Sequence, residues 1–387
     1  MKDRTIQVRG NQGYDKTTGA ISQPIYQTAT FRHPGFQQST GYDYSRVLNP
    51  TREELEKTLA LLEDGHRCWA FSSGMAAIGS LLKLFAPGDH ILLSEDLYGG
   101  TVRLAAKVYS RYGIVFEYVD TSDTEVIKKH LRPETKAVFV ETPSNPMMKI
   151  TDLTVASELA HANGAIFIVD NTFLSPHFQK PLHFGADIVI HSGTKYLCGH
   201  NDVVAGFVVI RNLPEIEALL ELVYKSEGAS LGPFDSWLML RSLKTLGIRL
   251  DKQEENAKKI AVWLQSAPSV TDVYYPGLPD QPGYGISKQQ TTGFGGMISF
   301  RVKTSEIAKA ALGRLELIYF AESLGGVETL LTYPIEQTHK ESPPELLAKA
   351  GVDDRLLRLS VGIEDVEDLI ADLEQAIREE AGKDEKL

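Results

Sequence analysis

Hydrophobic residues recur at helical spacing in two segments that follow residue 50. The first has Thr51 and Glu54 in a capping-box arrangement and stops before Gly65, with apolar positions at Leu55, Leu59 and Leu62. The second opens at Ser72-Ser73-Gly74, and one face of it collects Ile78, Leu81, Leu82 and Phe85. A capping residue, a period of 3.6 and a terminal glycine are typical of amphipathic helices. The pattern therefore predicts two helices.

Short and almost continuous apolar runs come next, most of them separated by helix-length segments such as residues 153–163. The runs are rich in Val and Ile and cover residues 90–94, 137–141, 165–170, 186–191 and 205–210. Strands that are buried on both faces lack polar alternation, and their alternation with helices is typical of a mainly parallel sheet. We therefore predict an α/β fold whose sheet is covered by helices.

The alternation ends in a long amphipathic region over residues 234–264. Shorter strand candidates then appear at residues 270–275, 296–302, 317–321 and 356–361, with a Pro/Gly-rich loop over 276–295. A closing helix has Val366, Leu369, Ile370, Leu373 and Ile377 on one face, and we expect the charged tail after it to fray. The sequence thus predicts an N-terminal arm (1–50) that packs on a neighbour, a large α/β domain (51–245) and a smaller C-terminal α+β domain (246–387).

Composition and charge restrict the class of protein. The 387 residues contain 51 Asp+Glu against 40 Lys+Arg, a net charge of −11, which makes nucleic acid and an anionic membrane poor partners. Two cysteines, Cys68 and Cys198, are too few for a disulfide framework and fit a reducing compartment. The first residues lack the apolar core of a signal peptide, and the apolar stretch near 203–210 is too short to span a bilayer. We expect a soluble, cytoplasmic protein.

Polar and ionisable residues follow the predicted strands, where open α/β sheets bind their ligands. They are Tyr98 (with Gly99 directly after it), Asn145, Asp170, Ser192, Thr194 and Lys195. Taken singly, Asp170 reads as a capping carboxylate and Lys195 as an ordinary exposed lysine. However, a lysine held near apolar or cationic groups can have a lowered pKa and form a Schiff base with an aldehyde.

The Ser73-Gly74-Met75 turn adds a site for a phosphate, because a helix N-terminus offers free amide groups and glycine permits close approach. Such a turn alone is also typical of an ordinary capped helix. The chain has neither the Gly-Lys-Ser/Thr of a Walker loop nor a G-x-G-x-x-G motif. A phosphate site, an aldehyde-reactive lysine and a buried carboxylate together meet the needs of pyridoxal phosphate, whose pyridine nitrogen requires an acidic partner.

A series of ordered motifs supports this interpretation. They are Tyr42-Asp43-Tyr44-Ser45-Arg46 with Asn49-Pro50-Thr51, Ser72-Ser73-Gly74-Met75-Ala76, Leu97-Tyr98-Gly99-Gly100-Thr101, Glu141-Thr142-Pro143-Ser144-Asn145-Pro146, Val169-Asp170-Asn171-Thr172, Thr194-Lys195-Tyr196, Glu322-Ser323-Leu324-Gly325-Gly326 and Arg358-Leu359-Ser360-Val361-Gly362. Over essentially the whole chain they resemble the cystathionine γ-synthase family of fold-type I pyridoxal-phosphate enzymes, also called the Cys/Met metabolism family. The resemblance implies an aspartate-aminotransferase-like fold, small amino-acid substrates and a homo-oligomer, with a dimer of dimers expected.

The resemblance also implies roles for individual residues. Lys195 would bind the cofactor aldehyde and shuttle a proton, Asp170 would pair with the pyridine nitrogen, and Tyr98 would stack on the ring. The phosphate would be held by Gly74, Met75, Ser192 and Thr194 of the same subunit and by Tyr44 and Arg46 of a neighbour. The cofactor oxygen and the substrate carboxylate would be held by Asn145, Ser323 and Arg358, with Glu322 at the mouth of the site.

Three further residues near the lysine could suggest other chemistry. His191 and His200 flank the lysine motif, but no acidic or cysteine ligands stand at metal spacing, so packing is the better interpretation and no metal is expected. Cys198 could be a nucleophile, although a buried structural thiol is the commoner case. Arg358 could be a surface arginine, but it lies between Leu357 and Leu359 and should face away from them.

The resemblance leaves several activities open. The first hypothesis is γ-replacement or γ-elimination on O-acylhomoserine or cystathionine, of the cystathionine γ-synthase type; the alternatives are a cystathionine γ-lyase or β-lyase that releases a 2-oxo acid and ammonia. Glu322 before Ser323 favours chemistry at the γ-carbon, and Gly100 disfavours methionine γ-lyases, which carry cysteine there. An aminotransferase is disfavoured by the Arg46 arm. A non-catalytic regulatory relative is disfavoured because Lys195, Asp170 and Arg358 are all present.

Overall fold

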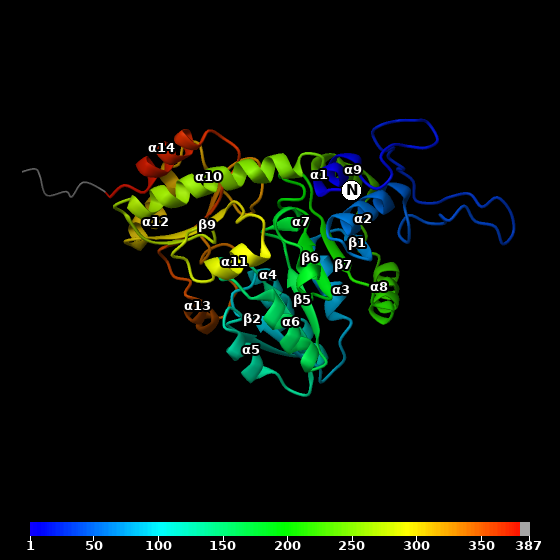
Figure 1. Cartoon of the computed structure of the whole chain (residues 1–387), viewed down its shortest axis with the longest axis horizontal. Coiled ribbons are helices and arrows are strands. Elements are labelled where there is room, and N and C mark those ends of the chain that lie inside the picture. Colours follow the sequence, from blue (N-terminus) through cyan, green and yellow to red (C-terminus); the bar gives the residue numbers. More distant parts are fainter. Residues whose placement is uncertain (380–387) are drawn as a thin grey trace, which may run out of the picture.

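A seven-stranded sheet forms the centre of the molecule. The computed structural model describes residues 1–379. The strand order is β1-β7-β6-β5-β4-β2-β3, and β1, β7, β6, β5 and β2 are labelled in Figure 1. Neighbouring strands are parallel except at β7, which runs antiparallel to β1 and β6. The strands span Arg67–Phe71 (β1), His90–Ser94 (β2), Val115–Val119 (β3), Thr135–Glu141 (β4), Ile166–Asp170 (β5), Ile188–Ser192 (β6) and Gly206–Ile210 (β7). The predicted helix-covered, mainly parallel α/β fold is confirmed.

Helices cover both faces of this sheet, and a separate hydrophobic core lies between the sheet and the helices on each face. Successive residues of a strand point to opposite faces, so Val189 and Ile190 of β6 belong to different cores. One core includes side chains of α2 (Pro50–Leu62), α6 (Leu153–Ala162) and α9 (Pro233–Leu243); the other includes α3 (Gly74–Leu82), α4 (Gly99–Lys107) and α8 (Pro214–Glu227). Shorter helical elements are α1 (Asp3–Arg9), η1 (Tyr109–Tyr112), α5 (Thr124–His130), α7 (Ser175–Phe178) and η2 (Pro181–Phe184).

A second sheet of five strands follows in the order β10-β11-β12-β9-β8. Its strands are Val270–Tyr274 (β8), Met297–Val302 (β9), Tyr319–Phe320 (β10), Leu330–Thr332 (β11) and Leu356–Ser360 (β12). One face packs against α10 (Leu246–Ser266), α12 (Ser305–Arg314) and α14 (Val366–Ala376), while α11 (Tyr284–Gln290) and α13 (Pro344–Ala350) complete this part. Leu357 and Leu359 belong to that core, and Arg358 points the other way, as predicted; its guanidinium bonds Asn145 of the first part. Helix α10 runs along both parts (Figure 1).

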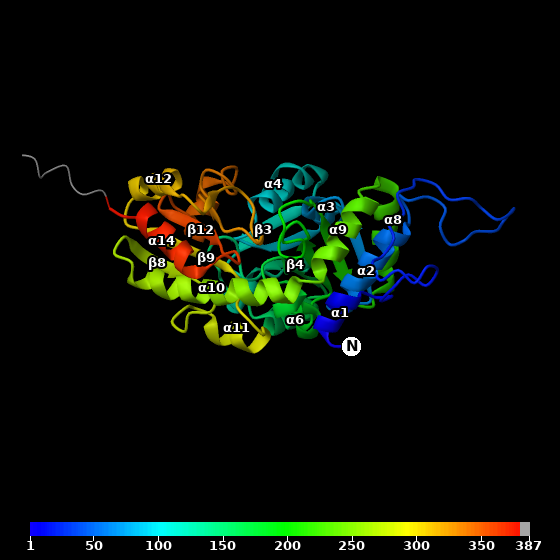
Figure 2. The same cartoon turned by 90° about the horizontal axis from the view of Figure 1, so that it is seen from above.

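The segment between α1 and α2 forms loops that extend beyond the body of the molecule (Figures 1 and 2). Most of its side chains are exposed, among them Ile21, Phe36 and Tyr44. Few of its residues join regular structure, apart from an isolated bridge between Thr30 and Tyr44. Hydrophobic periodicity arises when one face of an element is buried. Because most side chains of this segment are exposed, its sequence shows no such period.

The start of α2 differs from the predicted capping box. Asn49 is the capping residue, and its Oδ1 accepts a hydrogen bond from the backbone amide of Thr51 at 3.0 Å. Glu54 is not available as a cap because its Oε1 accepts the amides of Asn11 (2.8 Å) and Gln12 (2.9 Å). The predicted helix is thus correct, but the predicted cap is wrong, since Glu54 fastens the beginning of the arm instead.

Other element boundaries also differ from the prediction. Helix α3 ends at Leu82 and does not include Phe85, the region 234–264 is divided between α9 and α10, and the Pro/Gly-rich loop contains α11. The strand predicted at 317–321 is reduced to β10, and β1, β3 and β11 were not predicted. The boundary near residue 245 falls between α9 and α10, and the division into three domains remains a prediction. The tail expected to fray, residues 380–387, lies outside the described residues. Between residues 1 and 379 no helix is long and apolar enough to cross a membrane.

Candidate active site

A cavity of about 320 Å³ lies where the carboxyl ends of β4, β5 and β6 meet the second sheet. All predicted site residues line it except Tyr44 and Arg46. The lining consists of Ser73, Gly74, Met75, Ile78, Tyr98, Glu141, Asn145, Asp170, Thr172, Phe173, Ile190, Ser192, Thr194, Lys195, Val204, Glu322, Ser323, Leu324, Thr338 and Arg358. The fold therefore brings residues from distant parts of the chain into one cavity. Ser73 and Arg358, for example, are 285 positions apart in the sequence.

Lys195 follows β6 and points into this cavity. Its Nζ donates a hydrogen bond to Oγ of Ser323 at 2.9 Å. Burial, and then the positive charge of Arg358, lower the pKa of Lys195 to about 8. A lysine with this pKa has an appreciable neutral fraction near neutral pH, and the neutral amine is the form that attacks an aldehyde.

Asp170 is the last residue of β5 and lies opposite Glu141, the last residue of β4. Both carboxyl groups are buried, with 8% and 4% of the residue exposed. Asp170 Oδ1 accepts hydrogen bonds from the amide (3.0 Å) and the hydroxyl (2.5 Å) of Thr172. Burial raises the pKa of Asp170, although the Thr172 bonds oppose the shift; burial and the adjacent Asp170 raise the pKa of Glu141 well above its usual range. A positively charged group bound beside Asp170 would stabilise the charged form of this buried carboxyl group.

The N-terminus of α3 forms one end of the cavity. Ser73 caps the helix, since its Oγ accepts the backbone amide of Ala76 at 3.0 Å. Gly74 packs so tightly on β6 that an added Cβ would lie 3.0 Å from Cβ of Ser192. Ser192 ends β6, and the Thr194 hydroxyl accepts the amide of Ala205 at 3.1 Å. Amides at the start of α3 and two hydroxyls thus share this end of the hollow, which is the chemistry that binds a phosphate.

Tyr98 precedes α4 and presents its ring to the cavity, with 38% of the residue exposed. Its backbone amide donates to Oε2 of Glu141 at 2.9 Å, which joins the start of α4 to the end of β4. An added Cβ at Gly100 would lie 2.4 Å from Cε1 of the Tyr98 ring and 3.1 Å from Sδ of Met75. A cysteine at position 100 would therefore displace this ring.

Arg358 is the largest cationic group in the wall of the cavity, and only 1% of it is exposed. Its Nη1 donates to Oδ1 of Asn145 at 2.7 Å, and its Nη2 donates to the carbonyl of Ser323 at 3.2 Å and to Oγ1 of Thr332 at 3.3 Å. Burial lowers the pKa of Arg358 to about 10, so the group stays charged at neutral pH. Its buried Nε has no hydrogen-bond partner within residues 1–379, which suits a carboxylate in the cavity.

Ser323 connects the lysine and the arginine. Its hydroxyl accepts a hydrogen bond from Lys195 Nζ, and its carbonyl accepts one from Arg358 Nη2. The residue adopts φ = 103°, a conformation that residues with a side chain rarely take. Glu322, directly before it, is exposed where it lines the cavity. This sharp turn therefore places a hydroxyl inside the cavity and a carboxylate at its opening.

Tyr44 and Arg46 lie apart from the lining of their own cavity. Tyr44 is 46% exposed, and the Arg46 guanidinium lies 5.6 Å from the centre of its ring. Arg46 Nη1 donates to the carbonyl of Lys225 near the end of α8. Within a single chain these two residues are therefore not brought together with the other predicted site residues.

The alternative chemistry considered for His191 and Cys198 finds no support in their surroundings. His191 Nε2 lies 2.5 Å from Oε1 of Glu63, and both residues are fully buried on the other face of the sheet. The Cys198 thiol donates to Oδ1 of Asp202 at 3.0 Å, and burial raises its pKa to about 11, so it is protonated. Residues 1–379 contain no group of three or more His, Cys, Asp or Glu that could hold a metal ion.

Three residues that the structure brings to the site had no predicted role. Glu141 ends a strand as Asp170 does, so the rule of strand ends could have identified it. Thr338 lines the cavity, and His339 is buried beside it with Nε2 3.0 Å from the carbonyl of Asn145. Burial and Arg358 lower the pKa of His339 to about 4, so the ring is neutral and donates to that carbonyl. Both lie in an irregular segment without periodicity, and no local signal marks them.

The residues of the cavity fit pyridoxal phosphate. A helix N-terminus with neighbouring hydroxyls suits its phosphate, a lysine of lowered pKa suits its aldehyde, and a buried carboxylate suits its pyridine nitrogen. The tight contact of Gly74 with Ser192 leaves no room for a side chain between the helix and the strand. The donor set is therefore complete for this cofactor except for the two residues of the arm.

Comparison with known proteins gives the same result over the whole chain. Residues 4–378 match the family described as Cys/Met metabolism PLP-dependent enzyme. A cystathionine gamma-lyase of Bacillus subtilis is 50% identical over 97% of this chain and 99% of its own, and a cystathionine beta-lyase of Lactococcus lactis is 47% identical over 97% and 98%. A cystathionine gamma synthase of Xanthomonas oryzae, solved in complex with cystathionine, has a TM-score of 0.95 and 42% identity, covering 97% of this chain and 98% of that one.

The match in family, the near-complete coverage and the similarity in fold agree with a cavity suited to the cofactor. This chain is an enzyme that depends on pyridoxal phosphate, and it belongs to the family of Cys/Met metabolism PLP-dependent enzymes.

Proposed function

We propose that this enzyme acts at the γ-carbon of cystathionine or of an O-acylhomoserine. The reaction is γ-elimination, which releases a 2-oxo acid and ammonia, or γ-replacement, in which a thiol adds after the γ-substituent has left. The observation that carries this proposal is that Lys195, Arg358 and Glu322 line one cavity. They offer an amine that moves protons, a cation for the α-carboxylate and an acid at the mouth.

Pyridoxal phosphate supplies an aldehyde that binds amines covalently and a ring that accepts the electron pair released at the α-carbon. Lys195 would hold the aldehyde through Nζ and, once the substrate amine has replaced it, take the proton from the α-carbon. Asp170 would keep the pyridine nitrogen protonated, and Tyr98 would stack on the ring. Gly74, Met75, Ser192 and Thr194 would hold the phosphate.

The substrate carboxylate would bind Arg358, whose buried Nε is without a partner in the described chain. Asn145 and the carbonyl of Ser323 fix the guanidinium, so its direction is set before a substrate enters. The Ser323 hydroxyl would steady Lys195 Nζ between proton transfers. Glu322 would accept hydrogen bonds from the distal ammonium of cystathionine or of an incoming cysteine.

Tyr44 and Arg46 would complete the phosphate site of a neighbouring subunit. The exposed arm that carries them and their distance from their own cavity support this assignment. The minimal active unit would then be a dimer, and the expected assembly is a dimer of dimers. The two cysteines are free and buried, which suits an enzyme of the reducing cytoplasm.

The names of the relatives support both γ-reactions and one competitor. The gamma-lyase at 50% identity supports elimination, and the gamma synthase solved with cystathionine supports replacement. The beta-lyase at 47% identity represents cleavage at the β-carbon instead. Glu322 is our reason for preferring the γ-carbon.

The product formed from cystathionine distinguishes these reactions. With cystathionine alone we expect 2-oxobutyrate from γ-cleavage, measured by chromatography of the 2-oxo acids; with O-acylhomoserine and cysteine, a γ-synthase forms cystathionine. Glu322→Ala should lower kcat/KM for cystathionine about ten- to a hundredfold, because a charge-assisted hydrogen bond contributes roughly 1.5–3 kcal/mol. Glu367→Ala, which changes an exposed glutamate of α14, is the matched control. Pyruvate as the main product contradicts the proposal.

A further inference from the structure

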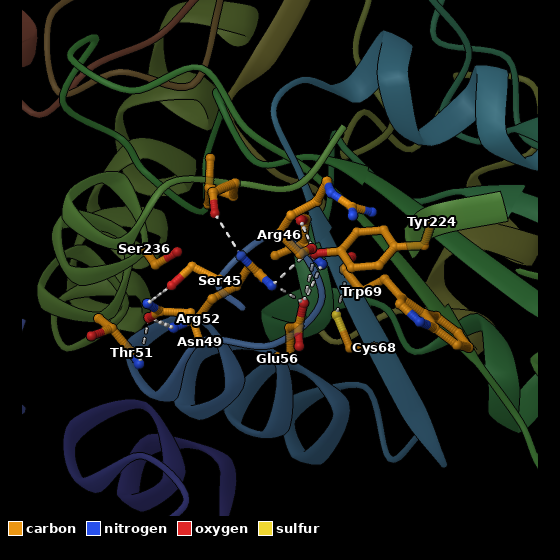
Figure 3. Close-up of polar contacts among 12 residues, drawn as sticks. Ser45, Arg46, Asn49, Thr51, Arg52, Glu56, Cys68, Trp69, Tyr224 and Ser236 are labelled. Atoms are coloured by element: carbon orange, nitrogen blue, oxygen red, sulfur yellow. Dashed lines mark hydrogen bonds and ion pairs between the residues drawn. The ribbon is translucent and has the colours of Figure 1, made fainter. Parts of the chain in front are cut away.

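A buried ion pair lies beneath the arm, away from the cavity. Arg52 and Glu56 stand one turn apart on α2, with 1% and 8% of each residue exposed. Arg52 Nε is 3.6 Å from Glu56 Oε1. Figure 3 shows these two side chains converging with Tyr224 between the turn that carries Arg46 and strand β1. None of these buried groups has a part in the chemistry described above.

On one side, the pair holds the turn from which Arg46 projects. Arg52 Nη2 donates to the carbonyl of Arg46 at 3.4 Å, and Nη1 donates to the carbonyl of Leu231 at 3.3 Å. Asn49 assists from the same end of α2, since its Nδ2 donates to Oγ of Ser45 at 2.9 Å. Arg52 of α2 thus holds the backbone of Arg46, and Asn49, the residue that caps α2, holds the side chain of Ser45.

On the other side, the pair is fixed to the sheet and to α8. Glu56 Oε1 accepts the backbone amide of Ala70 in β1 at 3.0 Å and the Tyr224 hydroxyl at 3.2 Å. The same hydroxyl lies 2.9 Å from the carbonyl of Ala70, and the Arg52 guanidinium lies 5.8 Å from the centre of the Tyr224 ring. Strand β1 leads directly into the turn that caps α3 at Ser73. A continuous chain of contacts therefore joins the arm to the rigid part of the fold.

Stability alone is a weak reason for this pair. Burial raises the pKa of Glu56 to about 7, with the charge of Arg52 foremost among the opposing influences. Replacing a buried ion pair by apolar side chains of similar volume is often neutral or even stabilising. An apolar pair, however, has no donor for the carbonyl of Arg46. What the ion pair adds beyond packing is the position of that backbone.

We propose that Arg52, held by Glu56, is a positioning residue that fixes the backbone of Arg46 so that the arm can complete the phosphate site of a neighbouring subunit. This inference rests on the assignment of Tyr44 and Arg46 to the neighbour's phosphate. It predicts that a defect at Arg52 appears in the site of the other subunit, although Arg52 lies in the core of its own.

Subunit mixing tests this prediction. The variant Arg52→Met/Glu56→Gln removes both charges, so no unpaired charge is buried, and Gln keeps an acceptor for Ala70. We expect its affinity for pyridoxal phosphate, measured by quenching of tryptophan fluorescence, to fall about tenfold or more, with turnover falling in parallel at limiting cofactor. Mixed with Lys195→Ala subunits, it should regain activity, because one site of each mixed dimer then combines an intact Lys195 with an intact arm. If equal amounts of the two variants exchange subunits at random, about one quarter of all sites should contain both intact groups.

Arg249→Met is the matched control. Arg249 is also a buried arginine that donates to backbone carbonyls, but these are the carbonyls of Ser242 and of Tyr196 and Leu197, which come directly after Lys195 of the same subunit. Its defect stays with its own site, so mixing with Lys195→Ala should restore nothing. Arg52→Lys keeps the charge beside Glu56 with a single donor group; it should fall between the wild type and the double variant, which tests the inference even if the double variant does not fold.

The mixing experiments test two statements separately: that Arg52 positions Arg46, and that Arg46 binds the phosphate of a neighbouring subunit. Arg46→Ala subunits are mixed with Lys195→Ala subunits in the same way. Recovery for both this mixture and the Arg52→Met/Glu56→Gln mixture supports the inference. Recovery for Arg46→Ala alone overturns the inference and leaves the arm assignment intact, because the Arg52 defect is then confined to its own subunit. If Arg46→Ala itself is not restored by Lys195→Ala subunits, the arm assignment fails, and the inference fails with it.

Discussion

The wall of the cavity and the N-terminal arm are built in opposite ways. Asp170 and Arg358 lie in strands and Lys195 follows β6, and each is fixed by a hydrogen bond with another side chain of the same chain. Tyr44 and Arg46 are exposed residues of the segment between α1 and α2, whose loops reach beyond the body of the molecule in part (Figure 2). The wall of the cavity is therefore formed within one subunit. The arm, in contrast, is attached to α2 of its own subunit, and its proposed binding site is the phosphate site of a neighbouring subunit.

This difference shows how one chain can divide a binding site. Residues that must keep an altered pKa, such as Lys195, need burial, and a single core provides it. A residue that only adds a charge to a phosphate can be supplied from an exposed segment, provided that its backbone is held. Changes in the wall should therefore damage a subunit's own site, and changes in the arm should damage the neighbour's.

The largest effect is expected for Lys195→Ala. The variant loses the covalent attachment of the cofactor and the group that moves the α-proton, so turnover should fall about 10³-fold or more, as for other lost acid–base groups. Steady-state assays with cystathionine measure the loss. Lys180→Ala, which changes a lysine paired with Asp3 and Asp64, is the control and should keep its activity. Near-normal turnover of Lys195→Ala would contradict the assigned role.

A smaller loss is expected for Arg358→Leu. Without the guanidinium the substrate carboxylate has no cationic partner, and losing one side of a buried charge pair costs about 2–5 kcal/mol, which is roughly thirtyfold or more in kcat/KM. Cofactor binding should persist, because Asp170 and the phosphate cradle are unchanged. The control is Arg355→Leu, since Arg355 pairs with Asp353 at the surface. Equal kcat/KM for wild type and Arg358→Leu would exclude Arg358 as the carboxylate site.

Arg46→Ala tests the arm and should have a more limited effect. One charge-assisted contact with the phosphate contributes roughly 1.5–3 kcal/mol, so cofactor affinity should fall about ten- to a hundredfold, with turnover restored at saturating cofactor. Fluorescence titration of the apoenzyme measures this. Arg32→Ala, another exposed arginine of the arm, is the comparison. Unchanged affinity in Arg46→Ala would leave the arm without its proposed function.

The smallest expected effect is on the pH dependence of cofactor attachment. The pKa of Lys195, about 8, lies below the ordinary value of 10.5, so the neutral amine increases as pH rises through 8. The rate at which the apoenzyme binds the cofactor aldehyde should rise about tenfold between pH 7 and pH 9 and then level off. Stopped-flow absorbance follows this step. A rate that is still rising steeply near pH 10 would mean that the fold does not lower the pKa of this lysine.

The sequence predicted the parallel sheet well because its strands are buried on both faces and read as apolar runs. Strand β2 was predicted at its observed bounds, and β4 to β7 within one or two residues. Two of the three missed strands have a different character: β3 lies at an edge of the sheet with Val115 exposed, and β11 has three residues. Periodicity cannot identify strands that are so short or half exposed. The third, β1, is buried and has five residues, so neither reason applies to it.

The candidate site was predicted in part from strand ends and in part from resemblance. Asp170 ends β5 and Lys195 follows β6, so the local pattern pointed to them. Arg358, Ser323 and Glu322 reach the cavity only through the packing of the second sheet on the first, and no local rule contains that contact. His339 illustrates the limit, because its burial against Asn145 depends on how an irregular loop folds back.

The most direct test of this account is to locate the covalent attachment of the cofactor. The wild-type enzyme, saturated with pyridoxal phosphate, is reduced with borohydride, digested and mapped by mass spectrometry. We expect the phosphopyridoxyl mass on the peptide that contains Lys195, and this mass should be absent from the same digest of Lys195→Ala. Labelling of a different lysine, or no labelling in a wild-type enzyme that is active, would contradict the assignment of this cavity as the active site.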